Sequence, residues 1–315
     1  MSDAVSDTVP VTLQHRAEWA ALAGTLATLR ALPLPAASAA GAAVLRALGP
    51  RLGPHKRATR QIAARLPQLS AREQAQVVTG MWQNIGRNLA DFAHLDTILA
   101  DPARVVEITG IAHVHEARTR GRGVVILPGH FGNWELIGVA ARMVGIIAAG
   151  FYRPLNNPLT NRLVYDQRAL SGHRMLAKAL KGVGSRQALA LLKRGGTLMM
   201  IADQHFSGGV TAPLLGAPAM TTPAPYLLAR HTGAAVVPVR CQRLGGHRCR
   251  IACEPPLELA GLDQIAAAAA INAVFERWIL DDPSQWLWLH RRWRVEGAGG
   301  GLCRFPDTSY SMNAR

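Results

Sequence analysis

From about residue 100 onward, short unbroken apolar runs alternate with segments of helical periodicity. The run Val124–Leu127 contains only valine, isoleucine and leucine. Such a run is typical of a strand buried on both faces, and helices between strands place those strands parallel to one another. Hydrophobic residues make up 49% of the chain, which is enough for a sizeable core. The sequence therefore predicts an α/β fold with a mixed, largely parallel sheet covered by helices.

The order of these runs defines the expected elements. Strands are predicted at residues 124–127, 146–153, 197–202, 235–242 and 248–253. Helices are predicted at residues 133–143, 158–170, 185–192, 223–231 and 263–280. Gly245 and Gly246 separate the last two strands, and such a pair favours a tight hairpin.

The N-terminal part is alanine-rich and apolar but interrupted. Residues 19–29 and 31–45 carry no charge, and Arg30 separates them. Each half is too short to span a bilayer, because a spanning helix needs roughly 20 apolar residues. Basic residues follow directly: Arg46, Arg51, Lys56, Arg57 and Arg60. The pattern predicts a broken helical hairpin at the cytoplasmic face of a membrane, facing anionic lipid. The alternative is an ordinary helical subdomain with a solvated basic face.

Four regions are expected along the chain. They are a membrane-associated helical segment at 1–56, a helical extension at 57–100, an α/β core at 101–295 and a disordered tail at 296–315. Within the extension, Ser70 and Glu73 form a capping box that starts a helix. No basic segment precedes the first apolar stretch, so no cleaved signal peptide is predicted.

The net charge is +15, from 35 Lys and Arg against 20 Asp and Glu. This charge favours an anionic partner, either a nucleic acid, an anionic membrane, an acidic protein or a phosphorylated substrate. Aromatic residues make up only 5% of the chain, and no nucleic-acid-binding motif is present, so nucleic acid is the least favoured partner. The four cysteines form no C-x-x-C pair, so the sequence predicts no zinc site.

One polar motif stands out, the segment Pro128–Glu135 directly after the strand at 124–127. Ligands of α/β sheets bind at the carboxyl ends of strands, where this segment is expected to lie. His130 in the turn and Glu135 in the first helical turn can form an imidazole–carboxylate pair, in which the carboxylate orients a general base. The motif lacks serine and cysteine, so the expected nucleophile is a hydroxyl of the substrate. The alternative is a capping network around Asn133.

Other polar residues also follow predicted strands. Arg153 is expected to bind a phosphate, or to be a plain surface arginine. Asp203 and Gln204 are expected to line the same pocket, or to form a turn or helix cap. A basic and aromatic cluster near the C-terminus predicts either interfacial anchoring or core packing with arginines reaching solvent. Its members are Trp286, Trp288, Arg291, Arg292, Trp293 and Arg294.

The H-x4-E motif in GHFGNWE resembles the signature of glycerolipid acyltransferases, and more closely that of the bacterial lipid A biosynthesis late acyltransferases (the lauroyl and myristoyl transferases). Four further stretches resemble that family in the same order, from about residue 20 to residue 295. They are YRPLNNPL at 152–159, IADQ at 201–204, LLG at 214–216 with TTP at 221–223, and PSQWLW at 283–288 with HRRW at 290–293. Leu214 and Leu215 stand where the family usually has two phenylalanines.

The resemblance implies an O-acyltransferase of the inner membrane, acting at its cytoplasmic face. His130 would deprotonate a hydroxyl of a lipid A precursor or related glycolipid, and Glu135 would orient His130. The oxygen would attack an acyl thioester carried on acyl carrier protein or coenzyme A, without a cofactor or metal. Substrate binding would fall to Arg153, Asn156, Asp203 and Gln204.

Two alternatives remain at this point. Within the acyltransferase class, the acceptor could be a mannosylated or amino-acid-linked membrane lipid. Outside that class, His130, Glu135, Asp203 and His205 could bind the metal of a hydrolase. Their spacing differs from the short His spacings of typical zinc sites, which disfavours the second alternative.

Overall fold

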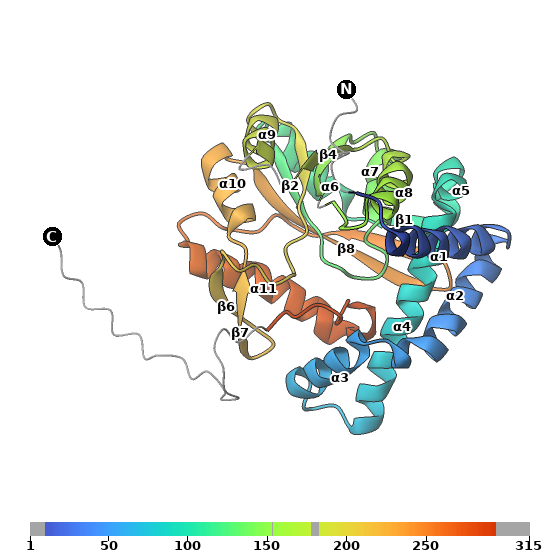
Figure 1. Cartoon of the computed structure of the whole chain (residues 1–315). Helices are drawn as coiled ribbons and strands as arrows, with labels where there is room; N and C mark the ends of the chain where they lie inside the picture. Colours follow the sequence, from blue (N-terminus) through green and yellow to red (C-terminus); the bar gives the residue numbers. More distant parts are fainter. Residues whose placement is uncertain (1–9, 153, 178–182, 294–315) are drawn as a thin grey trace.

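The computed structural model describes residues 10–152, 154–177 and 183–293 and has an α/β architecture (Figure 1). A seven-stranded sheet has the order β1-β9-β8-β2-β5-β3-β4, and a separate hairpin pairs β6 with β7. Every neighbouring pair in the large sheet is parallel except β8 with β9. The strands are β1 (Val106–Thr109), β2 (Val124–Leu127), β3 (Ala148–Tyr152), β4 (Arg174–Ala177), β5 (Thr197–Met199), β6 (Val210–Leu214), β7 (Ala217–Thr221), β8 (Ala235–Gly245) and β9 (Arg248–Cys253). The predicted mixed, largely parallel sheet is confirmed.

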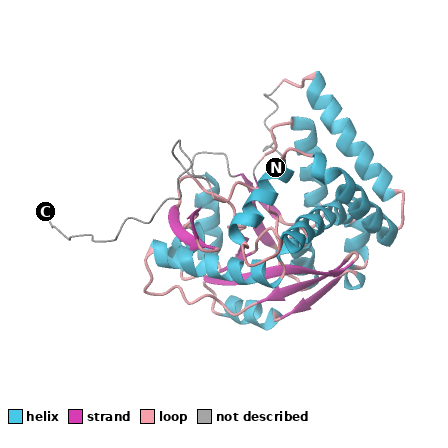
Figure 2. Ribbon diagram, turned by 90° about the horizontal axis from the view of Figure 1, so that it is seen from below, coloured by secondary structure: helices cyan, strands magenta, loops and turns pink. Residues whose placement is uncertain are grey.

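Helices cover both faces of the sheet (Figures 1 and 2). Successive residues of β2 point to opposite faces, so Val125 and Leu127 belong to one core cluster while Val124 and Ile126 belong to another. The first cluster includes residues of α9, α10 and α11, and the second includes residues of α6 and α7. These helices are α6 (Ile111–Thr119), α7 (Leu136–Met143), α9 (Val183–Lys193), α10 (Ala224–Thr232) and α11 (Gln264–Asp281). Both faces of the strand are therefore buried, as its unbroken apolar run predicts.

The N-terminal hairpin forms two helices, which lie with α4 beside the sheet (Figure 1). Pro33 occupies the N-cap position of α2 and Pro35 lies in its first turn, where a missing N–H removes no hydrogen bond within the helix. Gly41 of α2 and Gly86 of α4 let the two backbones touch, since a Cβ on either glycine would overlap the other's carbonyl. The remaining helices are α1 (Leu13–Arg30), α2 (Leu34–Leu48), α3 (Pro54–Arg65), α4 (Ala71–Ala93), α5 (Leu95–Ala100) and α8 (Pro158–Ala169), with 3-10 turns η1 (Gly49–Arg51), η2 (Pro102–Arg104) and η3 (Pro283–Gln285). None of the helices in the described ranges is both long and apolar enough to cross a membrane.

Helix α4 begins at the predicted capping box. The Ser70 hydroxyl accepts from the Glu73 amide at 3.3 Å, and the Glu73 carboxylate accepts from the Ser70 amide at 2.7 Å. Two donors that an unfinished helix end would leave unpaired are thereby satisfied.

Several boundaries differ from the prediction. Helix α7 begins at Leu136 rather than Asn133, because Gly132 takes a positive φ of 51° and the next three residues form turns first. Strand β5 ends at Met199, three residues early. Strands β1 and β4 and the β6–β7 hairpin were not predicted, since they are short and partly polar. The tail predicted at 296–315 lies outside the described residues.

The sheet order brings two loops together. Strands β2 and β5 are adjacent and parallel, with Val125 opposite Leu198. Their carboxyl ends therefore lie at the same edge of the sheet. His130 follows β2 and Asp203 follows β5, so the fold places these two candidate residues side by side.

Candidate active site

The turn after β2 is held by the segment that follows α11. The amide of Leu287 donates to the carbonyl of His130, and the amide of Gly132 donates to the carbonyl of Gln285, both at 3.0 Å. A Cβ on Gly132 would overlap the carbonyl of Cys241, so only glycine fits here. These contacts fix the backbone on both sides of the imidazole.

His130 is paired with Asp203. Its Nδ1 lies 2.8 Å from Asp203 Oδ1, and its own amide donates to Oδ2 at 2.8 Å. The indole of Trp286 donates to the same Oδ2 at 2.8 Å. Burial would raise the pKa of Asp203, but the adjacent His130 and these three hydrogen bonds hold that pKa at about 2. The carboxylate is therefore ionised at neutral pH, and Nδ1 of the imidazole carries the hydrogen between them.

The other ring nitrogen of His130 faces Gln204. The amide nitrogen of Gln204 lies 3.0 Å from His130 Nε2, 3.5 Å from His130 Nδ1 and 2.8 Å from Nε2 of His290. The His130 side chain is 13% exposed, so a substrate can reach it without unfolding the turn. When the hydrogen is on Nδ1, Nε2 carries the lone pair of the ring and is the atom that can act as a general base.

Glu135 contacts a different partner from the one expected. Its carboxylate forms a two-pronged ion pair with Arg168 of α8, including Nε to Oε2 at 2.9 Å, and accepts from the Trp134 indole at 3.1 Å. The carboxylate beside His130 is that of Asp203, so the expected contact between His130 and Glu135 is replaced by this arrangement. The reason is topological, because Glu135 ends the turn on the side of α8 whereas Asp203 arrives from the adjacent strand.

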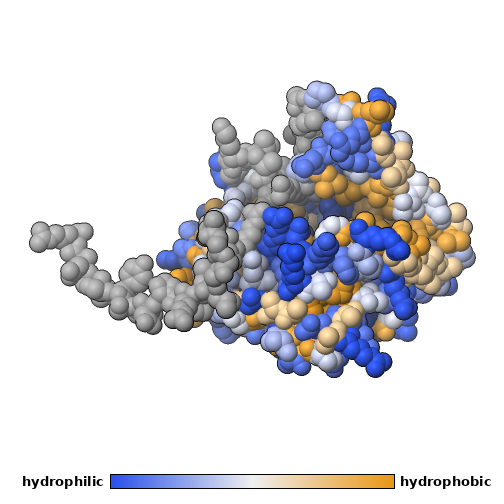
Figure 3. Space-filling model, turned by 60° about the horizontal axis from the view of Figure 1, so that its bottom comes forward, coloured by the Kyte–Doolittle hydropathy of each residue, from blue (hydrophilic) through white to orange (hydrophobic). Residues whose placement is uncertain are grey.

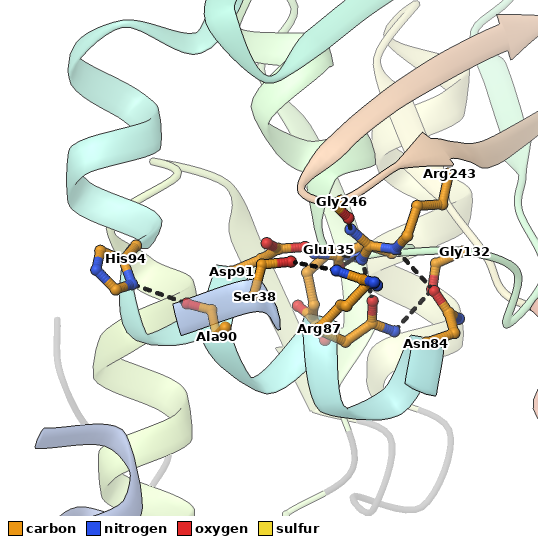
Figure 4. Close-up of polar contacts among 12 residues, drawn as sticks. Ser38, Asn84, Arg87, Ala90, Asp91, His94, Gly132, Glu135, Arg243 and Gly246 are labelled. Carbon is orange, nitrogen blue, oxygen red and sulfur yellow. Dashed lines mark hydrogen bonds and ion pairs between the residues drawn. The ribbon is translucent and has the colours of Figure 1, made fainter. Parts of the chain in front are cut away.

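Polar residues of α4 form hydrogen bonds with the turn that follows β2 (Figure 4). The side-chain amides of Asn84 and Asn88 both donate to the carbonyl of Gly132, at 2.9 and 2.7 Å. Arg243 of β8 donates to the oxygens of both amides, at 2.8 and 2.5 Å, which fixes their orientation. The same guanidinium pairs with Asp91 at 2.8 Å, and both side chains are almost fully buried. The turn that carries His130 thus rests on a buried, charge-assisted network.

Trp286 and Trp288 pack in the core, as one of the two interpretations predicts, but Arg292 is buried and does not reach solvent as that interpretation expected. Trp286 and Trp288 are at most 2% exposed, and their ring centroids lie 4.7 Å apart. The guanidinium of Arg292 is buried and donates to Thr221 and to the carbonyl of Met220, each at 2.7 Å. Burial lowers the pKa of Arg292 to about 10, so the group stays charged at neutral pH. Arg294 lies outside the described residues.

The remaining predicted residues lie apart from this cluster. Arg153 is outside the described residues. Asn156 lies on an exposed bend before α8. Its neighbour Asn157 is buried, caps α8 and donates to the carbonyl of His15 at 2.9 Å, which ties α1 to α8. Among the residues that the structure describes, no group of three or more His, Cys, Asp or Glu side chains is placed to hold a metal ion.

Several residues of the site were not singled out from the sequence, among them Arg168, Arg243 and His290. Arg168 and Arg243 are single basic residues without a local signal, because their partners are 33 and 152 positions away. His290 follows the tryptophan run, and its place in the HRRW stretch was the available signal. Tertiary contact alone brings all three to the site.

Comparison with known proteins shows that the chain is an acyltransferase and gives its family. The family model described as bacterial lipid A biosynthesis acyltransferase matches residues 10–295. The chain is 30% identical over 247 residues to the lipid A biosynthesis lauroyltransferase of Escherichia coli K12, covering 74% of this chain and 76% of that protein. It is 28% identical over 278 residues to the palmitoleoyltransferase of the same organism, covering 81% and 87%. The chain therefore belongs to the bacterial lipid A biosynthesis acyltransferase family.

A more distant similarity leads outside lipid A synthesis. The phosphatidylinositol mannoside acyltransferase of Mycobacterium tuberculosis H37Rv is 26% identical over 195 residues, covering 60% of each chain. The relatives in both groups are acyltransferases that differ in the acceptor their names give.

Proposed function

We propose that this enzyme transfers a fatty acyl chain from an acyl thioester to a hydroxyl of a lipid A precursor or related membrane glycolipid. The observation that carries the proposal is the His130–Asp203 pair, set in an H-x4-E motif at the carboxyl end of a central strand. It provides a base with a fixed tautomer, next to solvent and without a nucleophilic side chain of its own in the motif.

The proposed reaction takes place in one acyl transfer. Nε2 of His130 accepts the proton of the acceptor hydroxyl while the oxygen attacks the thioester carbonyl carbon. The tetrahedral intermediate then expels the thiolate, which takes the proton from His130 and leaves as the free thiol. The products are an ester and a thiol, and His130 returns to its neutral form. Asp203 stabilises the imidazolium that forms between the two steps.

Glu135 contributes through position in this mechanism. Its ion pair with Arg168 joins the start of α7 to α8, and its contact with Trp134 orders the ring that packs against His130, with centroids 4.9 Å apart. We propose that Glu135 stabilises the turn that carries His130 and takes no part in proton transfer. Arg153 and Asn156 remain candidates for binding the polar part of the acceptor or donor.

A second observation adds another candidate for the acceptor lipid. Similarity to a phosphatidylinositol mannoside acyltransferase makes a mannosylated lipid the second candidate. Mass spectrometry of membrane lipids from a deletion strain separates the two. A lipid A species lacking one acyl chain supports the first, and an under-acylated mannolipid supports the second.

The acyl donor is proposed to arrive on acyl carrier protein or coenzyme A. The net charge of +15 favours the acidic carrier protein. Added salt should then raise the apparent KM for the carrier-bound donor, because exposed charges are screened beyond about 8–10 Å at physiological ionic strength. A KM that salt leaves unchanged would favour coenzyme A.

The N-terminal hairpin is proposed to bind the cytoplasmic face of the inner membrane. Val44, Leu48 and Leu52 are 46–51% exposed, and Arg46 and Arg51 lie among them. Figure 3 shows hydrophobic atoms gathered on the right, the side where α1 and α2 lie in Figure 1. Apolar side chains beside basic ones favour the surface of an anionic bilayer.

A substitution in that surface tests membrane binding. Changing Val44, Leu48 and Leu52 together to glutamine should weaken sedimentation with phosphatidylglycerol vesicles. The matched control changes Ile265 and Leu280 of α11 to glutamine, since these side chains are similarly exposed, at 56% and 51%. Equal binding by both variants would contradict the assignment.

The central test of the function uses purified enzyme, labelled lauroyl donor and the lipid that accumulates in the deletion strain. Wild-type enzyme should transfer the label to that lipid, and His130→Ala should reduce turnover by roughly 10²–10⁴-fold, the usual size of a general-base effect. A folded His130→Ala enzyme with most of its activity would exclude His130 as the base.

A further inference from the structure

The amide of Gln204 has an orientation that its neighbours dictate. Asp203 is ionised and accepts the Nδ1 hydrogen of His130, so Nε2 of neutral His130 can only accept a hydrogen bond. The group 3.0 Å from Nε2 must therefore be the NH2 of Gln204 and not its oxygen. The same nitrogen lies 2.8 Å from His290 Nε2, which must accept the second hydrogen.

This arrangement places two donor hydrogens at the reacting centre. The acceptor hydroxyl must donate to His130 Nε2 during the reaction, and it then replaces the N–H of Gln204 there. One amide hydrogen is released, while the other stays on His290. The released N–H is then free to donate to another oxygen beside the hydroxyl that has displaced it.

We propose that Gln204 donates the hydrogen bond that stabilises the oxyanion formed in acyl transfer, and that His290 is the positioning residue that keeps the NH2 of Gln204 turned toward the reacting atoms. This inference rests on the proposed function, because it assigns a residue to the tetrahedral intermediate of that reaction. A donor aimed at the developing charge in a dry site is worth far more than the same donor in water.

The surroundings of His290 suit the role of an acceptor. The Gln61 side chain of α3 donates to the carbonyl of His290 at 2.8 Å, and Arg57 donates to the neighbouring Leu289 carbonyl at 2.7 Å. These bonds anchor the segment that carries the imidazole. Burial, with His130 and Arg57 nearby, lowers the pKa of His290 to about 4, although Asp203 acts in the opposite direction. His290 is thus neutral at physiological pH and keeps a lone pair for the amide of Gln204.

The test compares Gln204→Met, which keeps the side-chain volume without a donor, with the wild-type enzyme. Transfer of labelled lauroyl groups is followed from carrier protein or coenzyme A to the lipid from the deletion strain. Gln204→Met should lower kcat by roughly 10²–10³-fold with little change in the donor KM, as for loss of one oxyanion donor. His290→Leu should lower kcat by a smaller factor, and His290→Gln, whose carbonyl can accept, should recover most of that loss.

A pH profile separates this role from a merely structural one. If Gln204 only masked the Nε2 lone pair, Gln204→Met would shift the acid limb of the kcat/KM profile to higher pH and leave the plateau unchanged. That result would overturn the inference, as would equal activity of His290→Leu and His290→Gln. A lowered plateau with an unshifted limb supports it.

His130→Ala, assayed in parallel, distinguishes the two levels of the argument. If His130→Ala is inactive while Gln204→Met is fully active, the oxyanion assignment fails and the proposed function stands. If folded His130→Ala is active, the proposed mechanism itself fails. Circular dichroism of each variant confirms that the fold is retained.

Discussion

Nδ1 of His130 lies 2.8 Å from Oδ1 of Asp203, although 73 positions separate the two residues in the chain. The contact exists because β2 and β5 are parallel neighbours and both residues follow the carboxyl ends of these strands. A carboxylate that accepts two hydrogen bonds from one histidine residue fixes both the tautomer and the direction of its ring. The orienting residue is thus supplied by sheet topology and not by the local motif.

Asp203→Asn tests this pairing directly. The asparagine amide can donate to Nδ1, which would move the hydrogen to Nε2 and remove the base. We expect kcat to fall by roughly 10³–10⁴-fold, as when the orienting carboxylate of a catalytic triad becomes an amide. Steady-state acyl transfer measures the effect, and Glu135→Gln is the matched control, with a smaller loss. A greater loss for Glu135→Gln than for Asp203→Asn would return the orienting role to Glu135.

The ion pair between Glu135 and Arg168 is expected to increase the free energy of unfolding, because it joins the start of α7 to α8. The two side chains are 20% and 36% exposed, so removing one partner leaves a partly desolvated charge. Glu135→Gln and Arg168→Gln should each lower the free energy of unfolding, and the double variant should lose less than the sum. We expect a coupling energy of about 1–2 kcal/mol from a urea-unfolding double-mutant cycle. Additive losses would show that the pair contributes nothing beyond its separate residues.

The central strands and most helices could be predicted from the sequence, because their signals are local. Val124–Leu127 is apolar throughout and forms β2 with the predicted bounds. Ser70 and Glu73 start α4 as the capping box predicts. Asp263 caps α11, whose predicted bounds are off by one residue at each end. Patterns of this kind need no knowledge of distant contacts.

The partners within the site could not be predicted, because spacing in the chain says little about distance across a sheet. His130 and Glu135 are close in sequence but do not pair with each other. The imidazole of His130 pairs with Asp203, and the carboxylate of Glu135 pairs with Arg168. Asp203 was placed at the site, but its role as partner of His130 depends on strand order. The sheet order follows from packing of the whole chain and has no motif of its own.

Arg243→Met should be strongly destabilising. It removes the guanidinium that pairs with Asp91 at 2.8 Å and leaves the oxygens of Asn84 and Asn88 without this donor. Breaking a buried ion pair typically costs about 3–5 kcal/mol, and we expect a loss of that order in urea unfolding.

Arg104→Met is the control for Arg243→Met. Arg104 pairs with Asp101, and the side chains are 83% and 55% exposed. Exposed pairs contribute at most about 1 kcal/mol, so this variant should unfold almost like the wild type. Similar behaviour of the two variants would show that the Arg243 network does not support the turn.

Gly86→Ala tests the close packing of α2 on α4. The added methyl group would overlap the Gly41 carbonyl, so the helices must separate. We expect a loss of about 1–3 kcal/mol, the usual cost of overpacking. Gly24→Ala is the control, because a Cβ there has open space and alanine is the better helix former by about 1 kcal/mol. A neutral Gly86→Ala variant would contradict the tight contact.

Stability should also depend on pH through His290. Its pKa is lowered from 6.5 to about 4, first by burial and then by the charges of His130 and Arg57, against the opposing effect of Asp203. Between these pH values the unfolded chain binds a proton that the folded chain does not, so stability falls as pH falls through this window. From pH 7 to pH 5 the contribution of this one group to the free energy of unfolding should decrease by about 2 kcal/mol. His290→Gln removes the titration, so urea unfolding of this variant should lose about that much less than the wild type over the same interval. All other residues are the same in both proteins, so their contributions cancel in the comparison. An identical pH dependence would mean that His290 is protonated as readily in the folded protein as in the unfolded chain, which is incompatible with its acceptor role toward Gln204.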